Sequence, residues 1–526
     1  MTDYLYPGIF NDVIGPVMRG PSSSHCAAAL RIGRIARDLL AGDLKEIFIQ
    51  FDPNGSIART HRTQGSDMGL YSGFLGWDAD DERLPGYDKA IKDAGIDIKI
   101  EIKAFDAPHP NTYKLTLKNN KETHDMTAVS TGGGMIEIIE IDGAAVSISG
   151  DYYETLIYSQ DNDEEIIKYL KNHTTADYIN LCTGHHSKFI QVNAQSFLQQ
   201  DILAQMQSTF KISAIKELKP VLPILSRKNL QVPFITCQEM LSYNHDKNLE
   251  LWELALHYES ARGNISHLEV FQKMKDIARI MKKSILQGIQ GTKYEDRVLG
   301  YQSGSFKTKM DNKQLLEGGI LNRMILYTTA MMEVKSSMGV IVACPTAGSC
   351  AGLPGACLGA ADCMGLSEEE VTKALLAAGM IGIFIASHAT FAAEVEGCQA
   401  ECGAASGMAA AALVTLAKGT NKQAIAAASM ALQNIFGLVC DPVANRVEVP
   451  CLGKNIMAAS NALSCANMAL ANFDPVIPLD EVIEAMDKVG KSLPYELRCT
   501  ALGGLSITKT SKKIEKQLAR GASKRE

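Results

Sequence analysis

The alternation of apolar and polar residues marks the first 145 positions as a mixture of strands and helices. Period-two alternation predicts strands at Glu46–Phe51, Ile96–Ile102 and Tyr113–Leu117. Apolar residues at helical spacing predict a helix at Ala27–Ala41, ahead of these strands. The pattern therefore indicates an α+β N-terminal domain over residues 1–145.

The next segment, residues 146–222, alternates between short strand and helix patterns. The predicted elements are, in order, strand Glu154–Tyr158, helix Glu164–Asn172, strands Asp177–Cys182 and Lys188–Gln195, helix Gln200–Phe210 and strand Ile212–Leu218. This βαββαβ order indicates a small ferredoxin-like domain. A stretch with two prolines and little periodicity, Lys219–Arg227, then serves as a linker.

From residue 228 to residue 526 the pattern predicts helices almost throughout, which makes the C-terminal domain mostly all-α. Gly and Pro residues interrupt the helices in three predicted loops, Cys344–Gly355, Gly397–Gly407 and Cys440–Gly453. Loops held by a rigid helical scaffold are where functional side chains are expected. The predicted fold class is therefore multidomain, with the chemistry in the helical part.

The most apolar stretch of this helical part, Ala374–Ala393, is apolar enough to resemble a membrane span. It contains Ser387, His388 and several small residues, and its neighbours are rich in alanine. We therefore expect a helix that is buried on all sides in the helical domain, and no membrane association.

Composition excludes some functions. The 526 residues include 46% hydrophobic and 21% charged residues, as in an ordinary globular protein, and the formal net charge of -7 disfavours nucleic-acid binding. The opening residues Met1–Tyr4 lack a basic signal-peptide region, so a cytoplasmic protein is expected. In such a chain the 13 cysteines are expected to be reduced thiols or metal ligands.

Three cysteines in the Gly/Pro-rich loops are candidate metal ligands. Cys398, Cys440 and Cys451 are separated by 41 and then 10 residues. Three thiolates suit an iron-sulfur cluster with one open iron corner, which suggests a hydro-lyase. On spacing alone, simple packing of buried cysteines is an equally good interpretation. A second alternative adds Cys402 and makes a closed four-thiolate zinc site in a non-catalytic protein.

A second candidate site is Gly20–His25, directly before the first predicted helix. The hydroxyls of Ser22, Ser23 and Ser24, with backbone N–H groups at the positive end of a helix dipole, would form a cup for a carboxylate. His25 is expected to titrate near neutral pH. The alternative is a serine-rich helix cap followed by a surface histidine.

Together these segments resemble the iron-sulfur-dependent L-serine dehydratases, or L-serine ammonia-lyases, in their single-chain form with fused β-type and α-type domains. The resemblance covers almost the whole length and rests on six motifs in one order: Gly-Pro-Ser-Ser-Ser-His (20–25), Cys-Pro-Thr-Ala-Gly-Ser (344–349), Gly-Cys-Gln-Ala-Glu (397–401), Gly-Leu-Val-Cys-Asp-Pro-Val (437–443), Val-Pro-Cys (449–451) and Leu-Arg-x-Thr-x-x-Gly-Gly-Leu (497–505). It implies a β-type domain at 1–145, an ACT-like domain at 146–222 and an α-type domain at 228–526.

The chemistry that the resemblance implies is dehydration and deamination of L-serine to pyruvate and ammonia, in amino-acid catabolism and gluconeogenesis. Cys398, Cys440 and Cys451 would hold a 4Fe-4S cluster, and no pyridoxal phosphate is expected. L-threonine or L-cysteine are alternative substrates. The small amino-acid substrate is the main expected partner, besides a second copy of the chain in a homodimer.

The resemblance also implies roles for other site residues. The expected substrate-binding residues are Ser22, Ser23, Thr346, Ala347, Gly348 and Ser349. Ser24, His25 and His61 are the expected catalytic residues, with His25 as the base that removes the α-proton. His61 is included because the histidine usual in the family is replaced here by Gln64.

Two further departures from the family pattern leave alternatives open. Cys499 stands where relatives usually have a glutamate, and it could reach the open iron as a displaceable resting ligand or simply fill the vacated space. The turn Ser159–Glu165 has no glycine, although ACT domains that bind effectors need a Gly-rich turn there. We therefore expect the ACT-like domain to serve structure or dimerisation.

Overall fold

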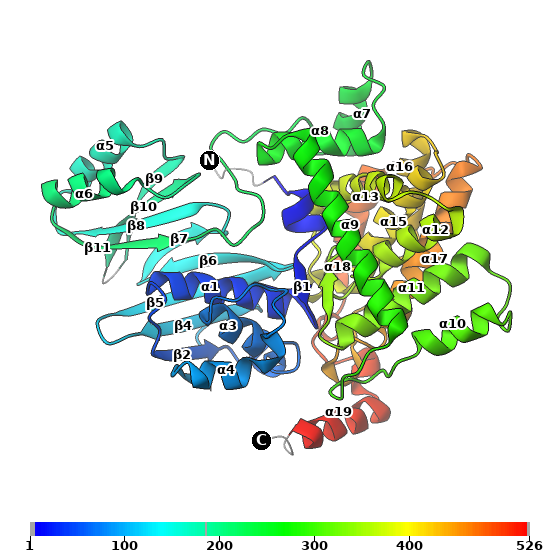
Figure 1. Ribbon diagram of the computed structural model, residues 1–526, viewed down its shortest axis with the longest axis horizontal. Coiled ribbons are helices and arrows are strands. Elements are labelled where there is room, and N and C mark those ends of the chain that lie inside the picture. Colours follow the sequence, from blue (N-terminus) through cyan, green and yellow to red (C-terminus); the bar gives the residue numbers. More distant parts are fainter. Residues whose placement is uncertain (1–5, 185–186, 523–526) are drawn as a thin grey trace. The chain divides into compact units, whose positions relative to one another are not determined.

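A computed structural model describes residues 6–184 and 187–522 of the chain (Figure 1). The chain divides into two compact units. One comprises Ser24–Leu230, and the other combines the segment up to Ser23 with Gln231 onwards. The first unit is rich in strands and the second in helices, as predicted, although the sequence did not indicate that residues 6–23 join the helical unit. Met1–Tyr4, on which the expectation about a signal peptide rests, lie outside the described residues.

The first part of the sheet-rich unit is a six-stranded sheet in the order β3-β2-β4-β5-β6-β7. Its strands are β2 (Glu46–Phe51), β3 (Asp97–Ile102), β4 (Thr112–Lys118), β5 (Thr123–Gly132), β6 (Met135–Ile141) and β7 (Ala144–Ile148). The β2–β3 pair is parallel and the other pairs are antiparallel. The three predicted strands are confirmed, whereas the β5–β7 meander was not predicted.

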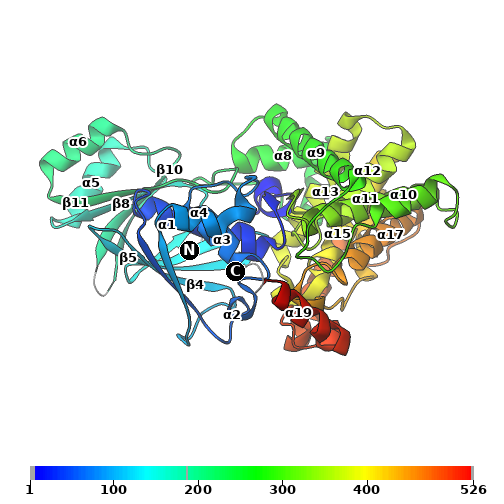
Figure 2. The ribbon, with the colours of Figure 1, turned by 60° about the horizontal axis from the view of Figure 1, so that its bottom comes forward.

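Three helices, α1 (Ala28–Leu39), α3 (Ser66–Phe74) and α4 (Tyr87–Asp93), accompany this sheet (Figure 2). α1 packs against both β5 and β6, and α3 packs against α1. The two helices approach each other so closely that a Cβ on Gly69 would lie only 2.1 Å from the backbone oxygen of Cys26. Glycine at this crossing lets the backbones touch, and the apolar side chains of both helices then cover the sheet.

A four-stranded antiparallel sheet in the order β11-β8-β10-β9 completes this unit. The elements are β8 (Tyr153–Ser159), α5 (Asp163–His173), β9 (Tyr178–Thr183), β10 (Lys188–Ala194), α6 (Gln200–Thr209) and β11 (Ile212–Leu218). The predicted βαββαβ order is confirmed, and whether it is an ACT domain stays a prediction. One face of the sheet packs on α5 and α6 through Ile157 and Ile190, while Leu156 on the opposite face joins the core of the six-stranded sheet.

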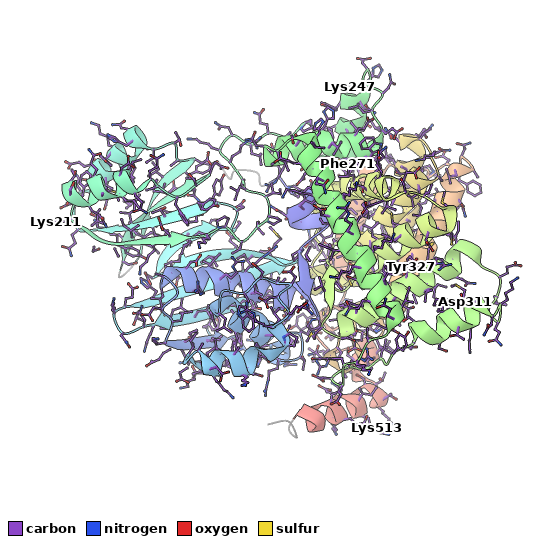
Figure 3. All side chains as sticks on the ribbon, in the orientation of Figure 1. Lys211, Lys247, Phe271, Asp311, Tyr327 and Lys513 are labelled. Atoms are coloured by element: carbon purple, nitrogen blue, oxygen red, sulfur yellow. The ribbon has the colours of Figure 1, made fainter. Side chains whose placement is uncertain are left out.

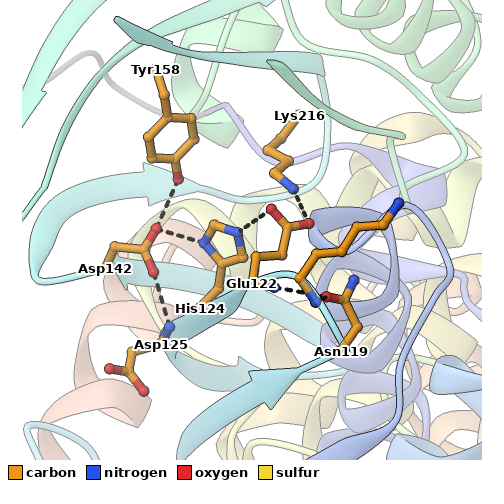
Figure 4. A network of polar contacts seen from close by, with 8 residues as sticks. Asn119, Glu122, His124, Asp125, Asp142, Tyr158 and Lys216 are labelled. Carbon is orange, nitrogen blue, oxygen red and sulfur yellow. Dashed lines mark hydrogen bonds and ion pairs between the residues drawn. The ribbon is translucent and has the colours of Figure 1, made fainter. Parts of the chain in front are cut away.

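A polar network links the two sheets of this unit (Figure 4). His124 on β5 contacts Asp142 through Nδ1 at 2.8 Å and Glu122 through Nε2 at 3.4 Å. The hydroxyl of Tyr158 on β8 donates to Asp142 at 2.9 Å, and Lys216 on β11 donates to Glu122. Strands from both sheets therefore meet in one set of charge-assisted hydrogen bonds.

The second unit consists mainly of helices. Their bounds are α7 (Cys237–Asn244), α8 (Leu251–Gly263), α9 (His267–Gln290), α10 (Ser303–Asp311), α11 (Gly319–Ser336), α12 (Gly352–Met364), α13 (Glu368–His388), α14 (Ala393–Glu396), α15 (Cys402–Leu416), α16 (Asn421–Gln433), α17 (Cys451–Leu470), α18 (Leu479–Ser492) and α19 (Lys509–Ala522). A small antiparallel pair, β1 (Val17–Arg19) with β12 (Val340–Val342), is the exception to the helical prediction. Charged side chains such as Asp311 on α10 and Lys513 on α19 extend outward (Figure 3).

Helix α13 is the one helix in the described part of the chain that is long and apolar enough to cross a membrane. It packs against α8, α9, α12, α15 and α18, and its central residues are buried. Its Gly379 and Gly382 lie against Ile9 and Val13 of the N-terminal turn, where a Cβ on Gly382 would lie 2.1 Å from Val13 Cγ1. The prediction of a buried core helix is therefore confirmed, and this contact helps fix the first residues to the helical unit.

Candidate active site

The three predicted cluster ligands lie in three separate segments of the helical unit. Cys398 is in a short 3-10 turn (Gly397–Gln399), Cys440 follows the end of a loop after α16, and Cys451 is the first residue of α17. All three predicted loops are shorter than the sequence suggested, and in the first of them α12 already begins at Gly352. α15 already begins at Cys402 and α17 at Cys451, because small residues there continue the helices rather than breaking them.

These cysteines belong to a group of five buried thiols, which we call the thiol cluster: Cys398, Cys402, Cys440, Cys451 and Cys499. Four of them pack in one buried group with the small side chains of Ala393 and Ala458, and Cys451 interacts electrostatically with Cys398. Cys402 contacts Cys398, and Cys499 contacts Cys440. Because the neighbouring alanine side chains carry no reactive group, the sulfur atoms are the main reactive groups of this region.

In each of two thiol pairs the hydrogen bond raises the pKa of one partner. The hydrogen bond with Cys398, together with burial, raises the pKa of Cys402 well above its usual value, and the hydrogen bond with Cys499 and burial do the same for Cys440. Burial raises the pKa of Cys451. Without a cation Cys402, Cys440 and Cys451 stay protonated at neutral pH, and a bound metal would favour their thiolate forms. A set of soft sulfur donors of this kind fits an iron-sulfur cluster.

Side chains beside the cysteines hold the three segments together. The amide of Gln399 donates to Met486 O at 2.6 Å and accepts from Gly437 N at 2.9 Å, so it ties the Cys398 turn to the approach of Cys440. The ammonium of Lys454 on α17 donates to Val439 O at 2.5 Å and to Asp441 Oδ1 at 2.9 Å. Both neighbours of Cys440 are therefore fixed to the helix that starts with Cys451.

Asn455, one turn after Cys451 and fully buried, joins the thiol cluster to the predicted substrate loop. Its side-chain amide donates to Gly348 O and to Cys451 O, each at 2.8 Å, and its Oδ1 accepts from Gly352 N at 2.8 Å. Its Nδ2 also lies 3.6 Å from the Cys402 sulfur. One amide thus satisfies buried backbone groups of two segments.

The predicted substrate loop around residues 344–349 is buried and rich in hydroxyl groups. Ser349 Oγ lies 3.2 Å from Thr346 Oγ1 and donates to Cys344 O at 3.0 Å. The backbone N–H of Ala347 donates to Ser23 Oγ at 3.2 Å, so the structure brings together two of the predicted substrate-binding segments. Ser22 lies beside Ser23 in the same unit.

A carboxylate, Glu401, lies over this loop. Thr346 Oγ1 donates to Glu401 Oε1 at 2.6 Å, and a Cβ on Gly348 would lie 2.7 Å from the same oxygen. Glycine at 348 therefore leaves space for the carboxylate. Burial raises the pKa of Glu401 to about 7, against the lowering effect of the Thr346 hydroxyl.

Two of the predicted catalytic residues, Ser24 and His25, lie at the start of the sheet-rich unit. They are part of a π-helical turn (Ser23–Ala27) that runs into α1, so they belong to a helix and not to a loop before one. His25 is 1% exposed, its Nε2 lies 2.9 Å from Thr60 Oγ1, and burial lowers its pKa to about 4. The expectation that His25 titrates near neutral pH is therefore wrong, because the buried ring disfavours charge.

The third predicted catalytic residue, His61, follows the short helix α2 (Ile57–Thr60) in the same unit. Its Nδ1 lies 2.7 Å from Asp67 Oδ1, and its ring packs 5.4 Å from that of Phe51. A carboxylate partner fixes the orientation and tautomer of an imidazole. The catalytic roles of Ser24, His25 and His61 stay predictions.

The zinc alternative, like the iron-sulfur cluster, stays a prediction. Within residues 6–184 and 187–522, no three His, Cys, Asp or Glu side chains are arranged to hold a single metal ion. A closed zinc site needs four ligands at about 2.0–2.3 Å from one centre. An iron-sulfur cluster is wider than one ion, so its ligands are expected to stand further apart.

Sequence reasoning missed the residues that organise the site: Gln399, Glu401, Lys454 and Asn455. Gln399 and Glu401 were inside a motif already identified, and Asn455 is four residues after Cys451 on one face of a helix. Their polarity in otherwise apolar helices was the available signal. However, many of their partners are distant in sequence: Gln399 contacts Gly437, 38 positions away, and Asn455 contacts Gly348, 107 positions away.

Comparisons with known proteins agree with this arrangement. The family described as "Serine dehydratase alpha chain" matches residues 246–506. The chain is 36% identical to a probable L-serine dehydratase alpha chain of Bacillus subtilis, over 55% of this chain and 96% of that one. It is 40% identical to the probable beta chain of the same organism, over 30% of this chain and 70% of that one.

A single-chain relative spans nearly the whole length. The L-serine dehydratase of Haemophilus influenzae is 25% identical over 93% of this chain and 96% of its own. The fold, the site and these comparisons define an enzyme of the ammonia-lyase class. Within that class the chain belongs to the L-serine dehydratase family, in the single-chain form.

Proposed function

We propose that this enzyme dehydrates and deaminates L-serine to pyruvate and ammonia, with a 4Fe-4S cluster held by Cys398, Cys440 and Cys451. The main support is that the three predicted ligands, from separate segments, belong to one buried thiol cluster. Asn455 connects that cluster directly to the predicted substrate loop. A cluster with an open iron corner supplies a Lewis acid that eases departure of a hydroxyl group.

The residues of the chain then have distinct roles. Thr346, Ala347, Gly348 and Ser349, with Ser22 and Ser23, would bind and orient the substrate through hydroxyl and backbone N–H groups. The nearly complete burial of Ser23, Thr346 and Ser349 excludes water, which strengthens each polar contact. His25 is neutral at pH 7 and so can accept a proton, as the predicted base must, with Ser24 and His61 in support.

L-threonine and L-cysteine are the alternative substrates, since each presents a leaving group at the β-carbon. An anaerobic assay of ammonia and 2-oxo acid over serine, threonine and cysteine decides between them. We expect the highest kcat/KM for L-serine. A clearly higher value for another amino acid would overturn the substrate assignment while leaving the elimination chemistry intact.

The cluster assignment is tested by replacing Cys398, Cys440 and Cys451 singly with Ser. Each variant is expected to lose iron, visible absorbance and turnover, because the hard hydroxyl is a poor ligand for iron. Cys182→Ser and Cys465→Ser are the controls, since these buried cysteines lie outside the thiol cluster. Full iron content in a ligand variant would remove that cysteine from the assignment.

Exposure to air provides a test of the cofactor as a whole. The iron atom at the open corner of the cluster is lost on oxidation, so enzyme activity should decay in air. Activity should return when ferrous iron and a thiol are added under anaerobic conditions. Activity that survives aerobic dialysis against a chelator would contradict the proposal.

A further inference from the structure

The carboxylate of Glu401 lies over the substrate loop, and the proposed function gives it no role. It is the last residue before α15, three positions after Cys398. The Thr346 hydroxyl holds Oε1 at 2.6 Å. Because Gly348 has no side chain, both oxygens can lie directly over the loop.

The surroundings of Glu401 are almost closed. Thr346 is 2% exposed, Ser349 is 0% exposed and Cys398 is 1% exposed, whereas Glu401 itself is only partly buried. Its charge acts on the thiols of Cys440, Cys451 and Cys499. Glu401 is therefore close enough to the thiol cluster for one small molecule to interact with both.

The nearby cations are already engaged. Lys454 binds Val439 O and Asp441, and the fully buried Lys335 on α11 donates to Val447 O. In the part of the chain that the structure describes, Glu401 has no ion pair and its Oε2 has no hydrogen-bond donor. A half-buried carboxylate beside sulfur ligands of negative charge is costly unless a cation compensates it.

We propose that Glu401 binds the α-ammonium group of the substrate and thereby selects α-amino acids over hydroxy acids that lack this group. The substrate ammonium supplies both the missing cation and the missing donor to Oε2. The inference rests on the proposed function, because it places the substrate between Glu401 and the cluster ligands. It assigns to this chain a specificity residue within the Gly397–Glu401 segment.

The test uses the anaerobically purified holoenzyme and two probes, L-serine and 3-hydroxypropionate, which keeps the hydroxyl and carboxylate but has no ammonium. In Glu401→Gln we expect the KM for L-serine to rise about ten- to a hundredfold, the effect of losing one charge-assisted hydrogen bond. Calorimetric affinity for 3-hydroxypropionate should stay unchanged or improve. Iron content reports cluster loading separately.

Two further variants keep the test decisive. Gly348→Ala displaces the carboxylate without removing its charge, and should weaken the binding of L-serine more than that of 3-hydroxypropionate, even if Glu401→Gln loads iron poorly. Glu448→Gln is the matched control, because this buried carboxylate already accepts from Val298 N and Leu299 N. It should leave the preference between the two probes unchanged.

Equal weakening of both probes, or a fall in kcat with an unchanged KM for L-serine, would overturn the proposal. The first result would make Glu401 structural, and the second would make it a proton-transfer group. Failure of the proposed function is distinguishable, since the parent enzyme itself would then lack iron or would not turn over serine.

Discussion

Cys499 shows how one residue can have more than one role in a buried site. It replaces a carboxylate of the family pattern, and its thiol contacts Cys440. Its backbone N–H donates to Cys440 O at 2.9 Å, so the last loop and a predicted ligand are in direct contact. Whether Cys499 serves as a resting ligand of the open iron or only fills the vacated space stays a prediction.

We therefore expect Cys499→Ala to keep the iron content of the parent, because the three predicted ligands remain. The variant would lack a displaceable resting ligand, so any lag in product formation after substrate addition should disappear. The cluster should also decay faster in air. Stopped-flow assays and visible absorbance after exposure to air measure both effects. Unchanged lag and lifetime would show that Cys499 only fills space.

Asn455 leads to a prediction about stability at the same scale. Asn455→Ala would remove the hydrogen bond to the buried carbonyl of Gly348, which costs about 1–3 kcal/mol, and would leave the N–H of Gly352 with only its 3.2 Å bond to Ser349 O. Chemical denaturation should show the loss. Asn461→Ala, on the same helix but with partners away from the substrate loop, is the comparison.

At the level of elements, the α1–α3 crossing is the tightest constraint in the sheet-rich unit. Gly69 of α3 faces Cys26 O, and Gly73 faces Leu30 O at a Cβ distance of 2.3 Å. The obstacles are backbone atoms, which cannot rotate away. Helix positions elsewhere usually tolerate alanine, so these two glycines are specific to the packing.

Gly69→Ala is accordingly expected to force α1 and α3 apart and to lower the free energy of unfolding by roughly 3 kcal/mol or more. Thermal unfolding of the holoenzyme followed by circular dichroism measures the change. Gly86→Ala is the control, since nothing lies within 4 Å of a Cβ there. A melting curve unaffected by Gly69→Ala would mean that the helices separate without cost.

At the level of the whole molecule, a buried carboxylic acid, Glu259, connects the N-terminal segment to the rest of the helical unit. Glu259 on α8 is 0% exposed and accepts from Ile9 N at 2.7 Å. Burial raises its pKa to about 7 from an ordinary value of 4.5, against the lowering effect of Arg262. The folded chain therefore favours the protonated form of Glu259.

The sign of the pH effect follows from that shift. The stability that Glu259 contributes is complete below pH 4.5 and is lost as the pH rises through about 7. We expect Glu259→Gln to reduce this fall in the free energy of unfolding between these pH values. Denaturant titrations at several pH values compare the two proteins, and an identical slope in both would contradict the assignment.

The homodimer expected from the ACT-like domain remains a prediction at this scale. Light scattering of the purified enzyme checks it directly.

The sequence alone determined many of the elements, although not the β5–β7 meander, because periodicity depends only on neighbours along the chain. Strand Glu46–Phe51 and the βαββαβ order of β8 to β11 follow from this periodicity. The motifs that identify the family can be read directly from the sequence. The three ligand candidates were recognisable for the same reason, since each lies in a short local motif.

Only the tertiary structure decided which distant residues meet. Asn455 and Gly348 are 107 positions apart, and Ile9 and Glu259 are 250 positions apart, so no local pattern could pair them. Burial decided the low pKa of His25 and the raised pKa of Glu401 in the same way. Solvation and partners are properties of the packed chain, and the physical state of a side chain is therefore settled only when the fold is complete.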